Sequence, residues 1–160
     1  MRITIAAVGR MKAGPEREMV ARYLDRAGGS GKPLALTGFE VAELTESRAS
    51  ASATRKSEEA KALRAALPEG IVVALDERGK SIGSEAFAQQ IGRWRDDGRP
   101  SASFVIGGAD GLDPQFVRSA DLVLSFSPLT WPHQLVRIML AEQLYRATTI
   151  LSGHPYHRGD

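Results

Sequence analysis

Short, almost continuous apolar runs that alternate with helix-length segments constrain the fold of this chain more than any other feature. Ile71–Leu75 and Phe104–Ile106 carry no polar side chain, which is typical of strands buried on both faces of a parallel sheet. Segments with helical periodicity lie between and around them. The pattern predicts an α/β fold, in which a mainly parallel sheet carries helices on both faces.

Five strands and five helices are expected along the chain. The expected strands are Ile3–Val8, Leu34–Val41, Ile71–Leu75, Ser103–Ile106 and Leu122–Ser125. The expected helices are Glu16–Arg26, Ala53–Ala66, Ser84–Arg95, Pro114–Ser119 and His133–Leu151. Residues 48–54, rich in Ala and Ser, are expected to form an exposed connector. Because the chain has 160 residues and neither a linker nor a repeat, we expect one domain spanning 1–160.

The composition excludes several classes of site. Apolar residues make up 42% and charged residues 25%, as in a folded globular protein. The chain has no cysteine, so disulfides, thiolate metal sites and cysteine nucleophiles are absent. The three histidines show no H-E-x-x-H spacing, which argues against a metal site. No apolar run reaches the roughly 18 residues of a membrane span, and Met1–Val8 resembles a buried strand more than a signal peptide. We expect a cytoplasmic protein without metal or membrane contacts.

Charge is distributed unevenly although the net charge is only +2. Residues 1–33 carry seven basic side chains and three acidic ones. The basic residues are Arg2, Arg10, Lys12, Arg17, Arg22, Arg26 and Lys32. Such a segment is either a solvated helix face or a surface that meets phosphates, and charge alone does not separate the two interpretations.

Three unusual loops follow expected strands, at residues 75–80, 106–112 and 125–132. Ligands of open α/β sheets bind outside the carboxyl ends of the strands, so these loops could line one pocket. Gly107 and Gly108 permit the close approach of a ligand, but they also suit a tight turn before a short helix opened by Asp113 and Pro114. They form neither a dinucleotide fingerprint nor a Walker loop.

The last expected helix carries charges on an otherwise apolar surface. Pro132 suits its first turn. Apolar residues surround the helix axis, so we expect both faces to be buried and one of them to meet a second subunit. Glu142 and Arg146 have the spacing of an i, i+4 ion pair. Arg137 needs either a charged partner or a ligand if it is buried.

All three histidines lie at the two ends of this helix: His133 at its start, His154 and His157 in the tail. The tail, residues 154–158, combines aromatic faces with an arginine. It could stack on an unpaired RNA base and contact phosphate, or it could be a frayed terminus.

Several spaced motifs together resemble the ribosomal RNA large subunit methyltransferase H family. The resemblance covers nearly the full length and is weakest between Gly28 and Thr54. The motifs are Val8–Lys12, Leu75–Asp76, Phe104–Leu112, Leu124–Ser125, Leu129–His133, Val136–Arg137, Glu142–Ala147 and His154–Arg158.

This resemblance implies an S-adenosylmethionine-dependent enzyme of the SPOUT superfamily that methylates N3 of a pseudouridine in 23S ribosomal RNA. It also implies a C-terminal trefoil knot, which general topology rules would not predict, and a homodimer. The RNA would be presented by the large subunit or by the assembled ribosome. The implied cofactor-binding residues are Leu75, Gly107, Gly108, Phe126, Ser127, Pro128, Leu129, Thr130, Trp131 and Pro132.

Methylation at N3 requires removal of a weakly acidic proton, so a base or a cation is expected near the methyl group. The candidates are His133, Arg137, His157 and Arg158. The expected RNA-binding residues are His154, Tyr156, His157, Arg158, Arg10 and Lys12. Two alternatives stay open: a non-catalytic RNA-binding or ribosome-associated module of the same fold, and a SPOUT methyltransferase with another RNA target.

Overall fold

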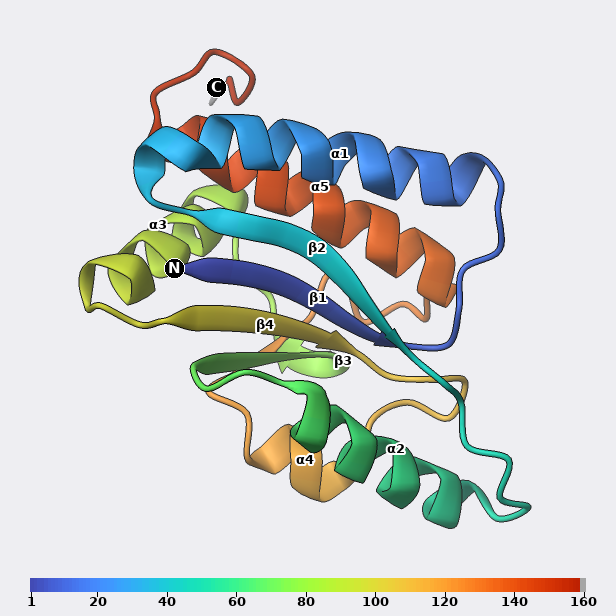
Figure 1. Cartoon of the computed structure of the whole chain (residues 1–160). Helices are drawn as coiled ribbons and strands as arrows, with labels where there is room; N and C mark the ends of the chain where they lie inside the picture. The colour runs from blue at the N-terminus through green and yellow to red at the C-terminus, as the bar shows by residue number, and fades with distance from the viewer. Residues whose placement is uncertain (159–160) are drawn as a thin grey trace.

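A five-stranded parallel sheet forms the centre of residues 1–158, the part of the chain that this computed structural model describes (Figure 1). The strand order is β2-β1-β4-β3-β5, and every neighbouring pair is parallel. The strands are β1 (Arg2–Val8), β2 (Thr37–Leu44), β3 (Ile71–Lys80), β4 (Ser101–Ile106) and β5 (Leu122–Leu124). The predicted α/β class is confirmed.

Helices cover both faces of the sheet, as predicted (Figure 1). Helices α1 (Pro15–Gly31), α3 (Ser84–Asp96) and α5 (His133–Leu151) share one apolar core with one face of the sheet. Helices α2 (Ser52–Ala66) and α4 (Pro114–Arg118) share a second core with the other face. Alternate residues of β1 divide between the two cores, since Ile3 and Ile5 belong to the first and Ala6 and Val8 to the second.

Helix α5 lies beside α1 and also packs against α3. The apolar surface of α5 is therefore largely covered within one chain. The many apolar residues of this helix do not by themselves require a second subunit. The parts left open lie near its beginning, where Leu135 is 42% exposed. The helix spans His133–Leu151, as predicted, but Pro132 is its N-cap, with a ψ of 139°, and not a residue of its first turn.

Several predicted boundaries were wrong. Strand β2 ends at Leu44 and not at Val41, and β4 begins at Ser101 and not at Ser103. The strand expected from Leu34 begins at Thr37, because residues 32–34 form a 3-10 helix that ends at Ala35 in the left-handed region. Helix α1 continues beyond Arg26 to Gly31, where a Cβ would lie 2.7 Å from the Phe39 ring. Residues 76–80, expected as a charged turn, continue β3 because Lys80 aligns with β5.

The end of β3, residues 76–80, lies close to β5 and to the segment that follows it. A Cβ on Gly79 would lie 2.7 Å from the Val123 carbonyl, and the Ser125 N–H donates to the Lys80 carbonyl at 2.9 Å. Close contact between these distant segments is compatible with a threaded chain. The trefoil knot itself stays a prediction of the family resemblance.

Candidate functional site

The three loops expected to form a pocket do converge, at the carboxyl edge of the sheet. They surround a cavity of about 440 Å³, which we call the loop cavity. Helix α5 contributes His133 and Val136 to its wall, and α2 contributes Lys56. The loops contribute Leu75, Asp76, Glu77, Arg78, Ala109, Asp110, Gly111, Leu112, Phe126, Ser127, Leu129, Thr130 and Trp131.

The glycines of the middle loop serve its own close packing. A Cβ on Gly107 would lie 2.7 Å from the carbonyl carbon of Gly111, which itself has φ +81°. A Cβ on Gly108 would lie 3.1 Å from both Glu59 and Val8. The loop therefore folds back on itself, and residues 109–112 face the cavity while Gly107 and Gly108 support them. Asp113 caps the short α4 helix, as predicted, by accepting from Gln115 N–H at 2.8 Å.

A bidentate ion pair that the sequence did not reveal ties this loop to α2. Arg55 donates from Nε to Asp110 Oδ2 at 2.7 Å and from Nη2 to Oδ1 at 3.1 Å. Its Nη1 donates to the carbonyls of Ala49 and Ser50, so one guanidinium joins three segments. Its hydrogen bonds lower the pKa of Asp110 below the usual value.

Polar side chains hold the segment after β5. Ser125 is buried, and its single hydroxyl hydrogen is shared between the carbonyls of Glu77 and Ser127, each 3.0 Å from Oγ. Ser127 Oγ accepts from the Leu129 N–H at 3.0 Å. Leu129 and Trp131 stay 67% and 38% exposed. The segment is thus anchored at its start and presents large apolar side chains at the mouth of the cavity.

Both signs of charge border the loop cavity. Arg78 donates to both oxygens of Asp76 at 3.0 Å, and this hydrogen bonding lowers the pKa of Asp76. The Arg78 side chain nevertheless remains 76% exposed. An exposed guanidinium at the cavity mouth is available to an anionic group.

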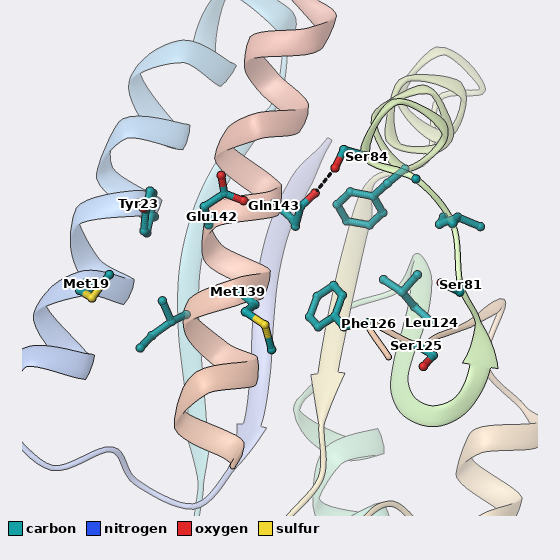
Figure 2. Close-up of a pocket in the computed structure, with 14 residues that line it drawn as sticks. Met19, Tyr23, Ser81, Ser84, Leu124, Ser125, Phe126, Met139, Glu142 and Gln143 are labelled. Carbon is teal, nitrogen blue, oxygen red and sulfur yellow. Dashed lines mark hydrogen bonds between the residues drawn. The ribbon is translucent and has the colours of Figure 1, made fainter. Parts of the chain in front are cut away.

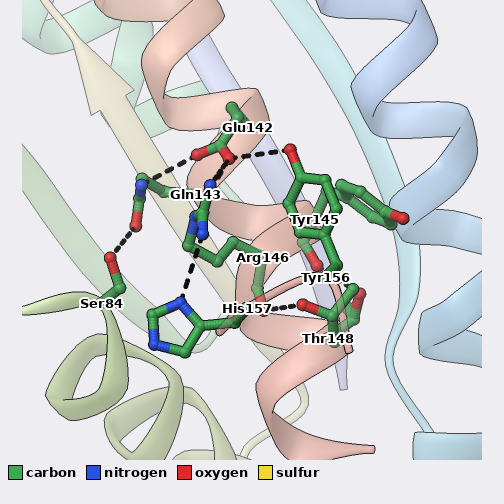
Figure 3. A network of polar contacts seen from close by, with 9 residues as sticks. Ser84, Glu142, Gln143, Tyr145, Arg146, Thr148, Tyr156 and His157 are labelled. Carbon is green, nitrogen blue, oxygen red and sulfur yellow. Dashed lines mark hydrogen bonds and ion pairs between the residues drawn. The ribbon is translucent and has the colours of Figure 1, made fainter. Parts of the chain in front are cut away.

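The C-terminal tail is not frayed, because a polar network fixes it to α5 (Figure 3). Glu142 Oε1 accepts from Arg146 Nη2 at 2.6 Å, which confirms the predicted i, i+4 pair, and from the Tyr156 hydroxyl at 3.1 Å. Arg146 also lies 3.2 Å from His157 Nδ1, and its guanidinium stacks 4.9 Å above the Tyr156 ring. Burial raises the pKa of Tyr156 to about 12, and the charge of Glu142 and its hydrogen bond to the hydroxyl add to the effect.

The tail and the loop cavity lie at opposite ends of α5. Arg146, which holds His157, follows His133 by 13 residues on this helix, so the two lie roughly 20 Å apart along the axis. Of the predicted catalytic residues, only His133 borders the loop cavity. His154 and Arg158 are exposed beyond the far end of α5.

Arg137 and the N-terminal basic residues lie elsewhere. Arg137 is buried, donates to Glu43 Oε1 at 2.6 Å and to the Gly9 carbonyl at 3.1 Å, and borders a different cavity. Its need for a partner is thereby met by an ion pair with β2. Arg10 and Lys12 are exposed in the loop after β1.

A further cleft of about 440 Å³ opens between α1, α5 and the start of α3 (Figure 2). Its apolar walls include Met19, Tyr23, Met139 and Phe126, and Met19 is 39% exposed. Polar groups close one side, where Ser84 donates to Gln143 at 2.8 Å beside Glu142. Leu124 and Phe126 border both this cleft and the loop cavity, so the two are adjacent.

No group of three or more His, Asp or Glu side chains within residues 1–158 could hold a metal ion. No helix in the same range is both long and apolar enough to cross a bilayer.

Comparison with known proteins identifies the class to which this α/β fold and its cavity belong. A family model described as a predicted SPOUT methyltransferase matches residues 1–157, and the chain belongs to this family. A protein of Allorhizobium ampelinum named ribosomal RNA large subunit methyltransferase H is 63% identical over 159 residues, or 99% of each chain. A protein of the same name from Rhodopseudomonas palustris is 57% identical over the same share of both chains.

The fold also resembles a solved structure. A probable methylase family protein from Haemophilus influenzae superposes with a TM-score of 0.50 at 12% identity, covering 99% of this chain and 70% of that one. At this identity, the likeness concerns the fold alone.

Proposed function

We propose that this protein methylates N3 of a pseudouridine in 23S ribosomal RNA, with S-adenosylmethionine as methyl donor. Support for an rRNA methyltransferase comes from relatives that share more than half of their residues over the full length and carry that name. The observation that carries the proposal is the loop cavity at the carboxyl edge of the sheet, whose walls include residues of several motifs that the resemblance is built on.

The residues of the loop cavity fit this cofactor. Its volume of about 440 Å³ lies in the range of pockets that enclose small cofactors. Leu75, Leu112 and Phe126 supply an apolar wall for an adenine, whereas Glu77 supplies negative charge for a sulfonium or an ammonium group. When bound, S-adenosylmethionine supplies an activated methyl group. The residues proposed to hold it are Leu75, Gly107 and Gly108, the last two through the loop that they support, and the segment 126–132.

The chain's own contribution is to orient the base and to remove its N3 proton. His133 borders the cavity and is exposed, so its imidazole is available as the base. Arg158 and His157 are proposed to stabilise the negative charge that develops on the uracil ring. Arg137 has its Nη1 and Nη2 groups engaged by Glu43 and Gly9, so we propose that it positions the first turns of α5.

A second subunit is proposed because His133 and the tail of one chain are too far apart to meet at one base. In a homodimer, the tail of one protomer would complete the loop cavity of its partner. Met19 at the cleft in Figure 2 and Leu135 on α5 are both exposed, and they offer an apolar surface for such a dimer. His154, Tyr156, His157 and Arg158 would then contact RNA, with Arg10 and Lys12 on phosphates.

Mapping of the modification tests the proposed activity. The protein is incubated with labelled S-adenosylmethionine and with ribosomal particles that lack the modification, as free large subunits or as assembled ribosomes, and the labelled nucleotide is identified. Label on N3 of a pseudouridine supports the proposal. An absence of label would favour the non-catalytic RNA-binding module, and label on another nucleotide would favour a sibling methyltransferase.

Mixed dimers test the shared site. His133→Ala and Arg158→Ala should each abolish turnover, whereas an equal mixture should recover about a quarter of the wild-type rate, because half of the dimers are mixed and each mixed dimer has one complete site. A mixture as inactive as its components would place both residues in the same protomer's site. The control is a mixture of His133→Ala with His133→Asn, which should recover nothing.

A further inference from the structure

A second groove, separate from the loop cavity, opens between α1 and the edge strand β2. Its volume is about 570 Å³, and we call it the edge groove. It is lined by Met11, Arg17, Val20, Ala21, Leu24, Asp25, Gly28, Gly29, Gly38, Phe39, Val41, Glu43 and Arg137. The groove thus combines an apolar wall with a few charged groups, as binding sites for small aromatic groups do.

One end of the edge groove carries an exposed guanidinium. Arg17 is exposed and donates from Nη1 to the Met11 carbonyl at 3.3 Å. Arg10 and Lys12 flank Met11 in the chain and are exposed as well. The acidic Asp25 lies two helical turns from Arg17 on α1, so an anion is expected at the Arg17 end.

A part-buried ion pair lines the groove and leaves one carboxylate oxygen of Glu43 without a hydrogen bond from the described residues. Glu43 Oε1 accepts from the Met11 N–H at 2.9 Å and from Arg137 at 2.6 Å, whereas no hydrogen bond within residues 1–158 uses Oε2. Burial by itself would raise the pKa of Glu43, but these hydrogen bonds and the charges of Arg137 and Arg17 lower it. The carboxylate therefore stays ionised near neutral pH, and its second oxygen can accept from an N–H group.

Arg137, the other partner of this ion pair, also has an unused hydrogen-bonding group. Its side chain is only 5% exposed, and its Nε has no hydrogen-bond partner within the described residues. A buried donor without a partner is uncommon and marks a place where a further acceptor would be stabilising. It also lies one turn beyond His133 on α5, so the edge groove and the loop cavity flank the beginning of the same helix.

We infer that the edge groove binds an unpaired nucleotide of the substrate RNA close to the methylated one; this inference rests on the proposed function. The phosphate contacts Arg17 and its basic neighbours, and the base lies against Val20, Leu24 and Val41 with an N–H directed to Glu43 Oε2. A base provides both the flat apolar face and the N–H donors that such a site recognises. Two anchoring points at the beginning of α5 would orient the target base over His133.

Filling the groove tests the inference without unfolding the chain. Gly28 lies in α1, and a Cβ there would meet no atom within 4 Å. Gly28→Leu should therefore occupy the groove and favour the helix. It should raise KM for unmodified ribosomal particles about tenfold, the size of one lost base contact, and leave S-adenosylmethionine affinity unchanged. The matched control is Ala86→Leu, which adds the same side chain at an exposed position of α3 outside the three cavities.

Several outcomes would overturn the inference. A wild-type KM for Gly28→Leu would exclude the groove from RNA binding, and loss of dimers in size-exclusion chromatography would make the groove a subunit contact. Affinity for the particles, measured by sedimentation, needs no turnover. An inactive wild-type protein would therefore refute the proposed function, while the comparison of Gly28→Leu with wild type would still decide the role of the groove.

Two further measurements locate the nucleotide. Arg17→Ser should reduce the slope of log affinity against log salt concentration by about one, as expected for one lost phosphate contact.

Because the chain has no cysteine, Ala21→Cys in the groove wall accepts a single thiol-linked photo-crosslinker. Crosslinks should map to a nucleotide near the methylated one, and crosslinks to protein alone would contradict the inference.

Discussion

The ion pair between Glu43 and Arg137 allows a quantitative prediction, because its two partners differ in burial. The Arg137 side chain is 5% exposed, whereas that of Glu43 is 23% exposed. Glu43→Ala leaves a guanidinium buried without its partner. Arg137→Met leaves a carboxylate that reaches solvent and keeps the hydrogen bond from the Met11 N–H. The first substitution should therefore be the more destabilising one.

The two substitutions should differ measurably in their effect on the free energy of unfolding. Removal of one partner from a buried pair costs about 3–5 kcal/mol, which we assign to Glu43→Ala. Arg137→Met substitutes an apolar chain of similar length and exposes the remaining charge to water, so its cost should be about 1 kcal/mol. At roughly 2–4 °C per kcal/mol for a chain of this size, Tm should fall by about 6–20 °C and about 2–4 °C respectively.

Urea unfolding at several pH values provides the assay. The native pKa of Glu43 lies below its ordinary value of 4.5, so its contribution to stability is present above that pH and is lost as the pH falls through the native pKa. Wild type should therefore lose stability below about pH 4.5 more steeply than Arg137→Met. Equal destabilisation by the two substitutions at pH 7 would refute the reasoning, because it would mean that the buried cation is not the costly partner.

Three other predictions concern the loop cavity and the tail. Gly107→Val should abolish S-adenosylmethionine binding in calorimetry, because a Cβ would lie 2.7 Å from the facing backbone, whereas Gly83→Ala, whose Cβ would meet nothing within 4 Å, should bind normally. Arg55→Gln, Asp110→Asn and the double variant should weaken cofactor binding equally; additive effects would contradict a shared role. The raised Tyr156 pKa of about 12 implies a contribution to stability that is complete below pH 10 and is lost as pH rises toward 12, a slope that Tyr156→Phe should remove.

Much of the fold could be predicted from local pattern. Ile71–Leu75 and Phe104–Ile106 are apolar enough to be central strands, and they are. Asp113 before Pro114 predicted a capped helix, and the spacing of Glu142 and Arg146 predicted their ion pair, both of which are present. These features depend on residues within about four positions of one another. At such short separations, the geometry of the helix or strand fixes how far apart two side chains lie.

The candidate site was only partly predictable. The rule that ligands bind at the carboxyl ends of strands brought together Leu75, the 107–112 loop and the 126–132 segment. No rule linked Arg55 to Asp110 across 55 residues, or Arg137 to Glu43 across 94. Such pairs depend on which strands become neighbours, and a charged residue has many possible partners along a chain.

The sequence by itself determined the α/β class, the order of its elements and the family, because apolar periodicity and spaced motifs are properties of the chain alone. Only the tertiary structure decided which functional groups share a site. It placed His133 at the loop cavity, the tail at the other end of α5, and Arg137 in the edge groove. The physical reason is that a helix of 19 residues is rigid and spans nearly 30 Å. Motifs at its two ends are therefore far apart in space, even though they follow one another closely in the sequence.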